Sequence, residues 1–341
     1  MSGPQEDSIG ELGEDELLRQ LSVRMASSGR ATPEASTELL VGPGDDTAYL
    51  RAGAATLVTT DVMVRGRDWL DEWSSPADVG VKLVNQNLAD LAAMAGRGTA
   101  LLLTLTAPPS LPVRWALEFI DGVAFAATTA DVSIAGGDLS SSLGEVSVAA
   151  TALGALGSGV SAPVLRSGAG AGEVVALSGG LGRSAAGLEV LQRGARGWYP
   201  PPEHAQQCAD WVGYHTRPWP DLTEGPVAGR EGATSMIDIS DGLLRDAGRV
   251  GAASGVTLDL DPAALSRWRD PIAAVLGATE AQSCVQAGGE EHVLLATFPS
   301  GTVPQGWVAI GQVRALSSLG AVLVDGHSVS ELGWDHFGGS R

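Results

Sequence analysis

Lysine is nearly absent from this sequence of 341 residues, because Lys82 is the only one and almost every other basic residue is arginine. Acidic residues outnumber basic residues by 40 to 21, which gives a formal net charge of −19. A protein that binds nucleic acid needs a basic surface to neutralise phosphates. The composition therefore argues against nucleic acid as a partner.

Cysteine and long hydrophobic runs are also scarce. Cys208 and Cys284 form no CxxC pair and cannot build a disulfide framework, which suits a reducing cytoplasm. Residues 146–165 carry no charge, but they are rich in small residues and contain Pro163, so we expect a buried strand and a linker, not a membrane helix. Residues 1–20 are polar and acidic and lack the apolar core of a signal peptide. We therefore expect a cytoplasmic protein without a membrane partner.

The usual signatures of nucleophilic or soft-metal chemistry are missing as well. The sequence contains no GxSxG elbow, no protein-kinase HRD and DFG set, and no cysteine in a nucleophile motif. The five histidines show no ligand spacing, and we expect three of them to be surface or packing residues, namely His292, His327 and His336.

Carboxylates beside glycine, serine or threonine are what the sequence does contain. Asp45 and Asp46 follow a Gly-Pro-Gly turn between two short apolar runs, a pattern that predicts strand, turn and strand over residues 39–50. Two adjacent carboxylates repel each other unless a positive charge lies nearby. Both a solvated turn and a cation site fit this pattern. Further acidic residues beside glycine, serine or threonine recur along the chain at the ends of apolar runs.

A helix is predicted to begin at Ser75-Pro76, where a capping residue precedes a proline at the first helical position, and to run to about residue 95. Lys82, Gln86 and Asp90 lie four residues apart and share one face of it. This polar face is either turned into a site or solvated, and the sequence leaves both alternatives open.

Two α+β domains are expected, with a boundary near residue 162, so that residues 1–162 and 163–341 form one unit each. Each unit presents acids at the ends of strands or on the polar helix face: Asp45, Asp46, Asp61, Asp90, Asp138, Asp238, Asp241 and Glu290. Hard oxygen ligands without histidine or cysteine suit Mg²⁺, which proteins usually hold with a few carboxylates and the substrate's phosphates. The pattern therefore permits a site with several Mg²⁺ ions and phosphates.

These motifs, in this order, resemble the thiamine-monophosphate kinase family. They are Gly44-Asp45-Asp46, Thr59-Thr60-Asp61, the helix with Lys82, Asn87 and Asp90, Gly136-Gly137-Asp138, Arg166-Ser167-Gly168-Ala169, Asp238-Ile239-Ser240-Asp241-Gly242, Gly288-Gly289-Glu290 and Trp334-Asp335-His336-Phe337. The resemblance implies the two-domain α+β fold of aminoimidazole ribonucleotide synthetase, with the N-terminal sheets of two chains pairing into a barrel in a homodimer. It also implies that ATP phosphorylates thiamine monophosphate directly, giving thiamine diphosphate and ADP.

The resemblance further implies roles for individual residues. Mg²⁺ would be held by Asp46, Thr59, Thr60, Asp61, Asp90, Asp138, Asp238 and Asp241, of which Asp61, Asp138 and Asp241 are the expected catalytic set. ATP would contact Gly136, Gly137, Arg166 and Ser240, and the thiamine moiety would contact Asp68, Glu290 and Trp334. Asp45 is the less certain member of its pair and would shape the turn or support the residues that hold the ion.

The sequence departs from the family pattern at three places. Arg67-Asp68-Trp69 stand where the family often has histidine and an aromatic residue, Leu139 replaces a common threonine, and Glu291-His292 replace Asp-Tyr. These changes affect the acceptor side more than the metal set. Another ATP-dependent synthetase of the superfamily and a non-catalytic nucleotide sensor are the alternatives. The sensor would have lost the metal-binding acids, and all the matched ones are present.

Overall fold

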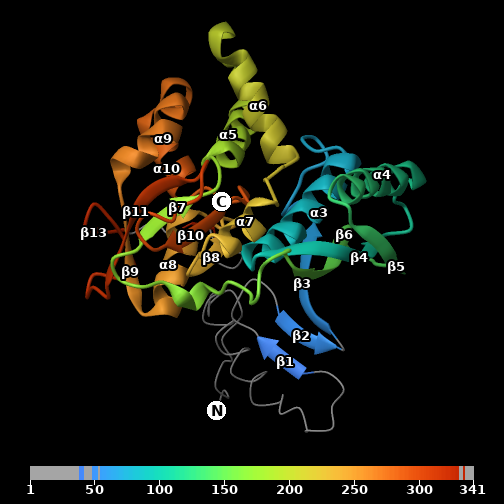
Figure 1. Ribbon diagram of the computed structural model, residues 1–341. Coiled ribbons are helices and arrows are strands. Elements are labelled where there is room, and N and C mark those ends of the chain that lie inside the picture. Colours follow the sequence, from blue (N-terminus) through green and yellow to red (C-terminus); the bar gives the residue numbers. More distant parts are fainter. Residues whose placement is uncertain (1–37, 42–47, 53, 330–332, 335–341) are drawn as a thin grey trace, which may run out of the picture.

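The computed structural model describes residues 38–41, 48–52, 54–329 and 333–334, which form two α+β units around separate sheets (Figure 1). The N-terminal unit has a six-stranded sheet in the order β1-β2-β3-β6-β4-β5, in which only β4 and β5 are parallel neighbours. Its strands are β1 (Glu38–Val41), β2 (Ala48–Ala52), β3 (Ala54–Val64), β4 (Gly96–Ala107), β5 (Ser133–Ser141) and β6 (Ser147–Leu156).

The C-terminal unit has a seven-stranded sheet in the order β13-β12-β9-β11-β7-β10-β8, antiparallel except between β12 and β9. Its strands are β7 (Val174–Leu177), β8 (Ser235–Asp238), β9 (Val256–Leu260), β10 (Leu294–Phe298), β11 (Val308–Ala315), β12 (Val322–Val324) and β13 (His327–Ser328). The expected boundary near residue 162 falls between the last strand of the first sheet and the first strand of the second.

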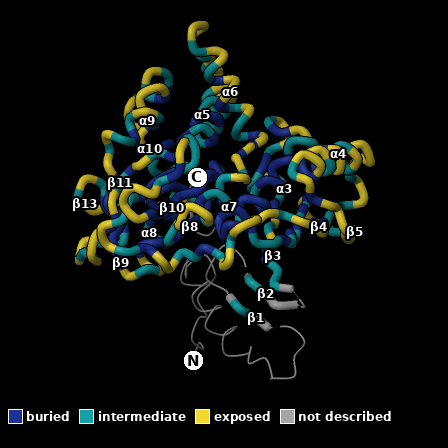
Figure 2. The backbone as a smooth tube through the Cα atoms, viewed as in Figure 1, coloured by how far each residue is buried: buried dark blue, intermediate teal, exposed yellow. Residues whose placement is uncertain are grey.

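Helix α3 (Pro76–Ala93) connects the two units. It begins as predicted at Ser75, whose hydroxyl accepts from the backbone N–H of Asp78 at 3.2 Å, while the Asp78 carboxylate accepts from the backbone N–H of Ser75 at 3.0 Å. This reciprocal capping box satisfies two N–H groups of the first turn. The helix packs on β3, β4 and β6 of its own unit and on β8 and β10 of the other, and it is buried along most of its length (Figure 2).

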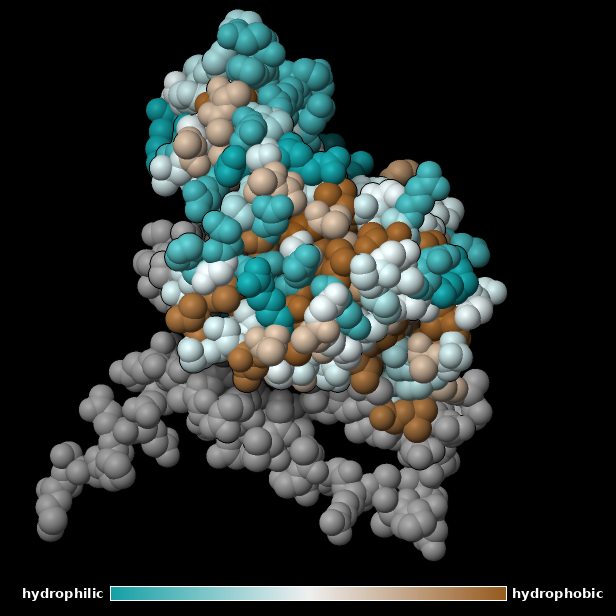
Figure 3. Space-filling model, turned by 60° about the vertical axis from the view of Figure 1, so that its left-hand side comes forward, coloured by the Kyte–Doolittle hydropathy of each residue, from teal (hydrophilic) through white to brown (hydrophobic). Residues whose placement is uncertain are grey.

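The remaining helices cover the sheets. They are α4 (Val113–Thr129) in the N-terminal unit, and in the C-terminal unit α5 (Arg183–Ala195), α6 (Ala205–Thr216), α7 (Glu224–Arg230), α8 (Leu243–Ser254), α9 (Pro262–Leu276) and α10 (Ala278–Gln286), with 3₁₀ turns at Arg166–Gly168 and Pro202–His204. The projecting end of the α5–α6 pair is mostly hydrophilic (Figure 3). No helix in the described part of the chain is long and apolar enough to cross a membrane.

Side-chain burial shows which face of the N-terminal sheet is covered. Helices α3 and α4 bury one face, where Leu57, Met63 and Leu101 lie in the core. The other face stays open, with Val62 60% exposed and every residue of the edge strand β5 exposed. Successive residues of a strand point to opposite faces, so Thr59 and Asp61 lie on one face and Thr60 on the other.

Candidate functional site

A cavity of about 750 Å³ lies between the two units. The N-terminal unit contributes the end of β3, the loop that follows it and one face of α3, and the C-terminal unit contributes the ends of β8 and α6, the first turns of α5, part of α10 and the 287–292 loop. Both charged and aromatic side chains line it, and among the aromatic ones are Trp69, Trp73 and Trp334.

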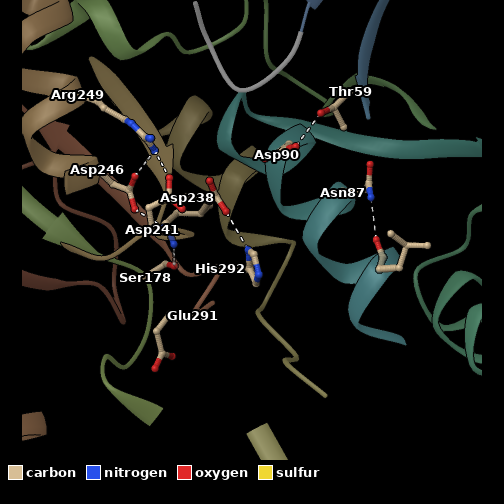
Figure 4. Close-up of polar contacts among 12 residues, drawn as sticks. Thr59, Asn87, Asp90, Ser178, Asp238, Asp241, Asp246, Arg249, Glu291 and His292 are labelled. Atoms are coloured by element: carbon tan, nitrogen blue, oxygen red, sulfur yellow. Dashed lines mark hydrogen bonds and ion pairs between the residues drawn. The ribbon is translucent and has the colours of Figure 1, made fainter. Parts of the chain in front are cut away.

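The polar face of α3 forms one wall. Lys82, Gln86 and Asp90 all line the cavity, and Lys82 is buried, so this face is not the solvated alternative left open by the sequence. The hydroxyl of Thr59 on β3 donates to Asp90 Oδ2 at 2.7 Å (Figure 4). The pairing of β3 with α3 thus orients the Asp90 carboxylate.

Asp61 on β3 lies beside this wall and close to the acids of the other unit. The pKa of its carboxyl group is raised to about 6, mainly by burial; Asp238 and Asp241 also raise this pKa, whereas His292 lowers it. Because charge is costly where carboxylates gather away from water, a cation in the cavity would favour the ionised form of Asp61. The cavity is therefore electrostatically suited to bind one.

The opposite wall is built where β8 ends at Asp238. Asp238 Oδ2 lies 3.0 Å from Nδ1 of the buried His292, and this contact with Asp238 raises the pKa of His292 although burial alone would lower it. Asp241 starts the turn into α8, where Arg249 donates to Asp241 Oδ2 at 2.6 Å and to Asp246 Oδ1 at 2.8 Å (Figure 4). The guanidinium thereby fixes Asp241 against the helix.

The 288–292 loop carries two residues in left-handed backbone conformation, Glu290 with φ of +59° and His292 with φ of +54°. Such angles are strained for residues other than glycine and persist only where the surroundings enforce them. Here the backbone N–H of Glu290 donates to Ser240 O at 2.7 Å, and that of His292 donates to Ile239 O at 2.8 Å. The loop is therefore pinned to the segment that follows β8.

Glu290 and Glu291 point in different directions from this loop. Glu290 faces the cavity and forms an ion pair with Lys82 of α3, which lowers the Glu290 pKa despite burial. Glu291 is fully buried and accepts from the backbone N–H of Ser184 at 2.9 Å and from Arg183 Nε at 3.1 Å. The start of α5, which follows the glycine-rich 178–182 turn, is thus capped by the protein's own carboxylate.

Trp334 closes the cavity from the C-terminal side. Its backbone N–H donates to Asp241 O at 2.9 Å, and Arg245 Nη1 donates to its carbonyl oxygen. The residue lines the cavity and is 41% exposed. Trp334 therefore places an aromatic side chain at the edge of the cavity.

The side chains in the cavity that could bind a metal ion are mostly oxygen donors. Asp61, Asp90, Asp238 and Asp241 all line the cavity, together with the hydroxyl of Ser240. Across the described ranges, no three histidine, cysteine, aspartate or glutamate side chains lie close enough together to hold a metal ion by themselves. Such a site suits Mg²⁺ that completes its coordination with water and phosphate oxygens.

Comparison with known proteins agrees with this geometry. The model of the family "AIR synthase related protein, N-terminal domain" matches residues 44–156. A thiamine-monophosphate kinase of Mycobacterium tuberculosis (strain ATCC 25618 / H37Rv) is 41% identical over 335 residues, which cover 97% of this chain and 93% of the relative. The chain belongs to the thiamine-monophosphate kinase family.

Two further relatives support the family assignment and the fold. A Corynebacterium glutamicum thiamine-monophosphate kinase is 36% identical over 93% of this chain and 91% of its own length. A solved structure described as "AaThiL complexed with AMPPCP and TMP" superposes with a TM-score of 0.82 at 28% identity, covering 97% of this chain and 99% of that one. The family resemblance and the α+β fold expected from the sequence are thus confirmed.

The cavity of this kinase-family chain brings together eight of the residues singled out from the sequence: Asp61, Asp68, Asp90, Asp238, Ser240, Asp241, Glu290 and Trp334. Thr59 lies one hydrogen bond away, on Asp90. Asp45 and Asp46 lie outside the described residues, although the flanking strands β1 and β2 pair as the predicted strand-turn-strand requires. The helical spacing of apolar residues also predicts an amphipathic helix over residues 11–25, and these residues too lie outside the described ranges.

Five other singled-out residues line no part of the cavity. Gly136, Gly137 and Asp138 lie on the exposed edge strand β5, and Arg166 lies in a 3₁₀ turn whose carbonyl accepts from Ser254 Oγ at 2.8 Å. Thr60 points to the open face of the sheet, where its hydroxyl donates to Ala150 O at 3.0 Å.

Two positional expectations were wrong. Asp61 does not end a strand, because β3 continues through Val62, Met63 and Val64, which pair with β6. Asp138 does not follow a strand either, because β5 runs through Gly136-Gly137-Asp138 to Ser141 in parallel pairing with β4. In both places backbone pairing with a neighbouring strand overrides the local turn signal.

Two histidines lie in the cavity that were not predicted from the sequence to belong to a site. His292 was expected to be a surface or packing residue, yet it lies in the cavity against Asp238, and its Nε2 is buried without a hydrogen-bond partner in the described structure. His215 also lines the cavity. The position of His292 directly after Gly-Gly-Glu-Glu was a usable signal, whereas nothing local marks His215.

Proposed function

We propose that this protein transfers the γ-phosphoryl group of ATP to thiamine monophosphate, forming thiamine diphosphate and ADP, in thiamine diphosphate biosynthesis. The cavity between the two units, lined by carboxylates from both, carries this proposal. It is supported by the family membership and by the similar structure described with AMPPCP and TMP.

The chemistry explains why the cavity needs no dedicated general base. A phosphate monoester has a second pKa of about 6, so the acceptor oxygen is already ionised near neutral pH. The remaining tasks are to align two polyanions and to neutralise their charge. Rigid α3 and the pinned 288–292 loop provide the alignment, because both position their side chains on backbone that is fixed by packing or hydrogen bonds.

Asp61, Asp90, Asp238 and Asp241 would hold Mg²⁺ in this cavity, with Asp61 and Asp241 in the catalytic set. The oxygen-only donor set of these residues fits the ion. The bound ion would supply positive charge that offsets the repulsion between the phosphates of the two substrates. Asp46, Thr59, Thr60 and Asp138 stay proposed ligands on the strength of the sequence motif alone.

The two substrates would occupy different parts of the site. Ser240 is the proposed ATP contact that lines the cavity, with Gly136, Gly137 and Arg166 outside it. Glu290 and Trp334 would contact the thiamine moiety, with the indole ring stacked on the cationic thiazolium. Asp68 is a weaker candidate for the acceptor, because its Oδ2 already accepts from the backbone N–H of Val64 at 2.6 Å.

A homodimer would bring the outlying residues into a site. The face of the N-terminal sheet left open by α3 and α4 carries Val62 and Leu102, both exposed apolar residues, and among the described strands β5 is an edge of the sheet that includes Asp138. Edge strands and apolar patches of this kind commonly pair with a partner. We expect sheet-to-sheet pairing of two cytoplasmic copies, and light scattering that finds only a monomer of 34.7 kDa would contradict it.

Incubation of the purified protein with ATP, Mg²⁺ and thiamine monophosphate tests the proposed reaction. The expected product is thiamine diphosphate, formed in a one-to-one ratio with ADP. ADP without thiamine diphosphate, or no turnover by folded protein that still binds ATP, would contradict the proposal.

A further inference from the structure

Glu290 lies where three parts of the chain meet, and both of its carboxylate oxygens have partners. Oε1 is ion-paired with Lys82 of α3. Oε2 lies 3.3 Å from Nδ1 of His215, at the end of α6, and 3.5 Å from the hydroxyl of Ser184, at the start of α5. The side chain is therefore held from both units.

His215 acts here as a neutral group. The pKa of its imidazole is lowered to about 4, mainly by burial; Glu290 raises this pKa and Lys82 lowers it, each by less than burial. At neutral pH only one ring nitrogen therefore carries a proton. Ser184 Oγ lies 3.0 Å from His215 Nδ1.

The hydrogen-bond directions follow from what each group can do. An ionised carboxylate only accepts, so Ser184 donates its proton to Glu290 Oε2. The Ser184 oxygen is then free to accept from Nδ1–H of His215, which also faces Oε2. The imidazole, the hydroxyl and the carboxylate form one chain of donors that ends on Glu290.

The backbone of Glu290 is fixed as well as its side chain. Its left-handed φ of +59° is enforced by the bond from its N–H to Ser240 O, and a side chain at Gly289 would overlap that same carbonyl oxygen. A carboxylate has about four lone-pair positions. Lys82 takes a position on Oε1, and His215 and Ser184 take positions on Oε2, which leaves room for a further donor in the cavity that Glu290 lines.

We propose that His215 is a positioning residue for acceptor specificity: with Ser184 and Lys82 it orients Glu290 to accept hydrogen bonds from an N–H donor of the acceptor, such as the amine of an aminopyrimidine ring. This inference rests on the proposed function. It assigns His215 no contact with ATP and no proton transfer to the phosphate.

Loss of the His215 donor should therefore weaken acceptor recognition selectively. A hydrogen bond that fixes a charged group contributes enough to change affinity about 10- to 100-fold. For His215→Leu we expect the KM for thiamine monophosphate to rise by that factor while the KM for ATP changes less than about twofold. His215→Asn keeps a donor near the Nδ1 position and should restore most of the affinity, whereas His215→Gln moves the donor outward and should not.

An acceptor analogue makes the test specific to the amine. An analogue of thiamine monophosphate with a carbonyl oxygen in place of the ring amine should be rejected by the wild type. The preference of the wild type for the amine over this analogue should fall at least about tenfold in His215→Leu. His204→Leu, at the other end of α6, is the matched control and should keep the wild-type preference.

A double-mutant cycle with Ser184→Ala tests the chain of donors. Both side chains act through Glu290 Oε2. We therefore expect the KM of the double variant for thiamine monophosphate to lie within about twofold of the higher KM of the two single variants. Three results would each overturn the inference: fold-changes in the acceptor KM that multiply in the double variant, an acceptor KM that does not change in His215→Leu, or equal rises of the KM for ATP and for the acceptor. A wild type that makes no thiamine diphosphate would instead overturn the proposed function, so the two failures are distinguishable.

Discussion

Replacement of Asp61 by asparagine should stabilise the metal-free protein while abolishing its activity. Asparagine keeps the size of the side chain and removes the charge that Asp238 and Asp241 oppose. The folded state holds the Asp61 proton to a higher pH than the unfolded state, so ionisation opposes folding. This penalty is absent well below pH 4 and complete well above pH 6.

The pKa sets the size of the effect. A rise from 3.8 to about 6, at about 1.36 kcal/mol per unit, is a penalty of about 3 kcal/mol at pH 7.5 and of about 1 kcal/mol at pH 4.5. With an unfolding entropy of about 2.1 cal/mol/K per residue, the melting temperature of Asp61→Asn should exceed that of the wild type by about 4 °C at pH 7.5 and about 1 °C at pH 4.5.

Thermal unfolding in EDTA at both pH values measures this difference. Addition of Mg²⁺ and ATP should reverse the order at pH 7.5, because only the wild type has the ionised Asp61 ligand. The variant should form no thiamine diphosphate above background. An equal melting temperature at pH 7.5, the same gain at both pH values, or near-native turnover would refute the reasoning.

Two other substitutions test packing and acceptor binding. Gly225→Ala should lower the melting temperature by about 2–4 °C, since its new Cβ would overlap the Ala92 carbonyl where α7 crosses α3. At Gly213 on α6 a new Cβ would point into open space, so Gly213→Ala should not lower the melting temperature. A similar fall in melting temperature in both variants would contradict this account. Trp334→Ala should raise the KM for thiamine monophosphate about 3- to 30-fold by removing a cation–π contact, with the KM for ATP unchanged in steady-state kinetics. An unchanged acceptor KM would remove the ring from the site.

Much of the fold followed from local signals. The Ser75-Pro76 cap marks the start of α3, and the expected end near residue 95 is two residues beyond the observed end at Ala93. The helices α9 and α10 were missed, although Asp261-Pro262 is a start signal of the same type, with the Asp261 carboxylate accepting from the backbone N–H of Ala263 at 2.8 Å.

The acids of the site were predictable because their motifs are local. Asp238, Ser240 and Asp241 follow one strand, and Asp90 shares its helix face with Lys82. Their partners were not predictable, since His292 reaches Asp238 across 54 residues of sequence and His215 faces Ser184 across 31. Such contacts depend on how β10 pairs with β8 and how α6 packs on α5, which no local pattern encodes.

One assay tests the central claim most directly: quantification of thiamine diphosphate and ADP when the purified wild type is given ATP and thiamine monophosphate, with Mg²⁺ or with EDTA. The account predicts equimolar products that depend on Mg²⁺ and disappear in Asp61→Asn. Thiamine diphosphate formed equally well in EDTA, or ATP hydrolysis without it, would contradict the account.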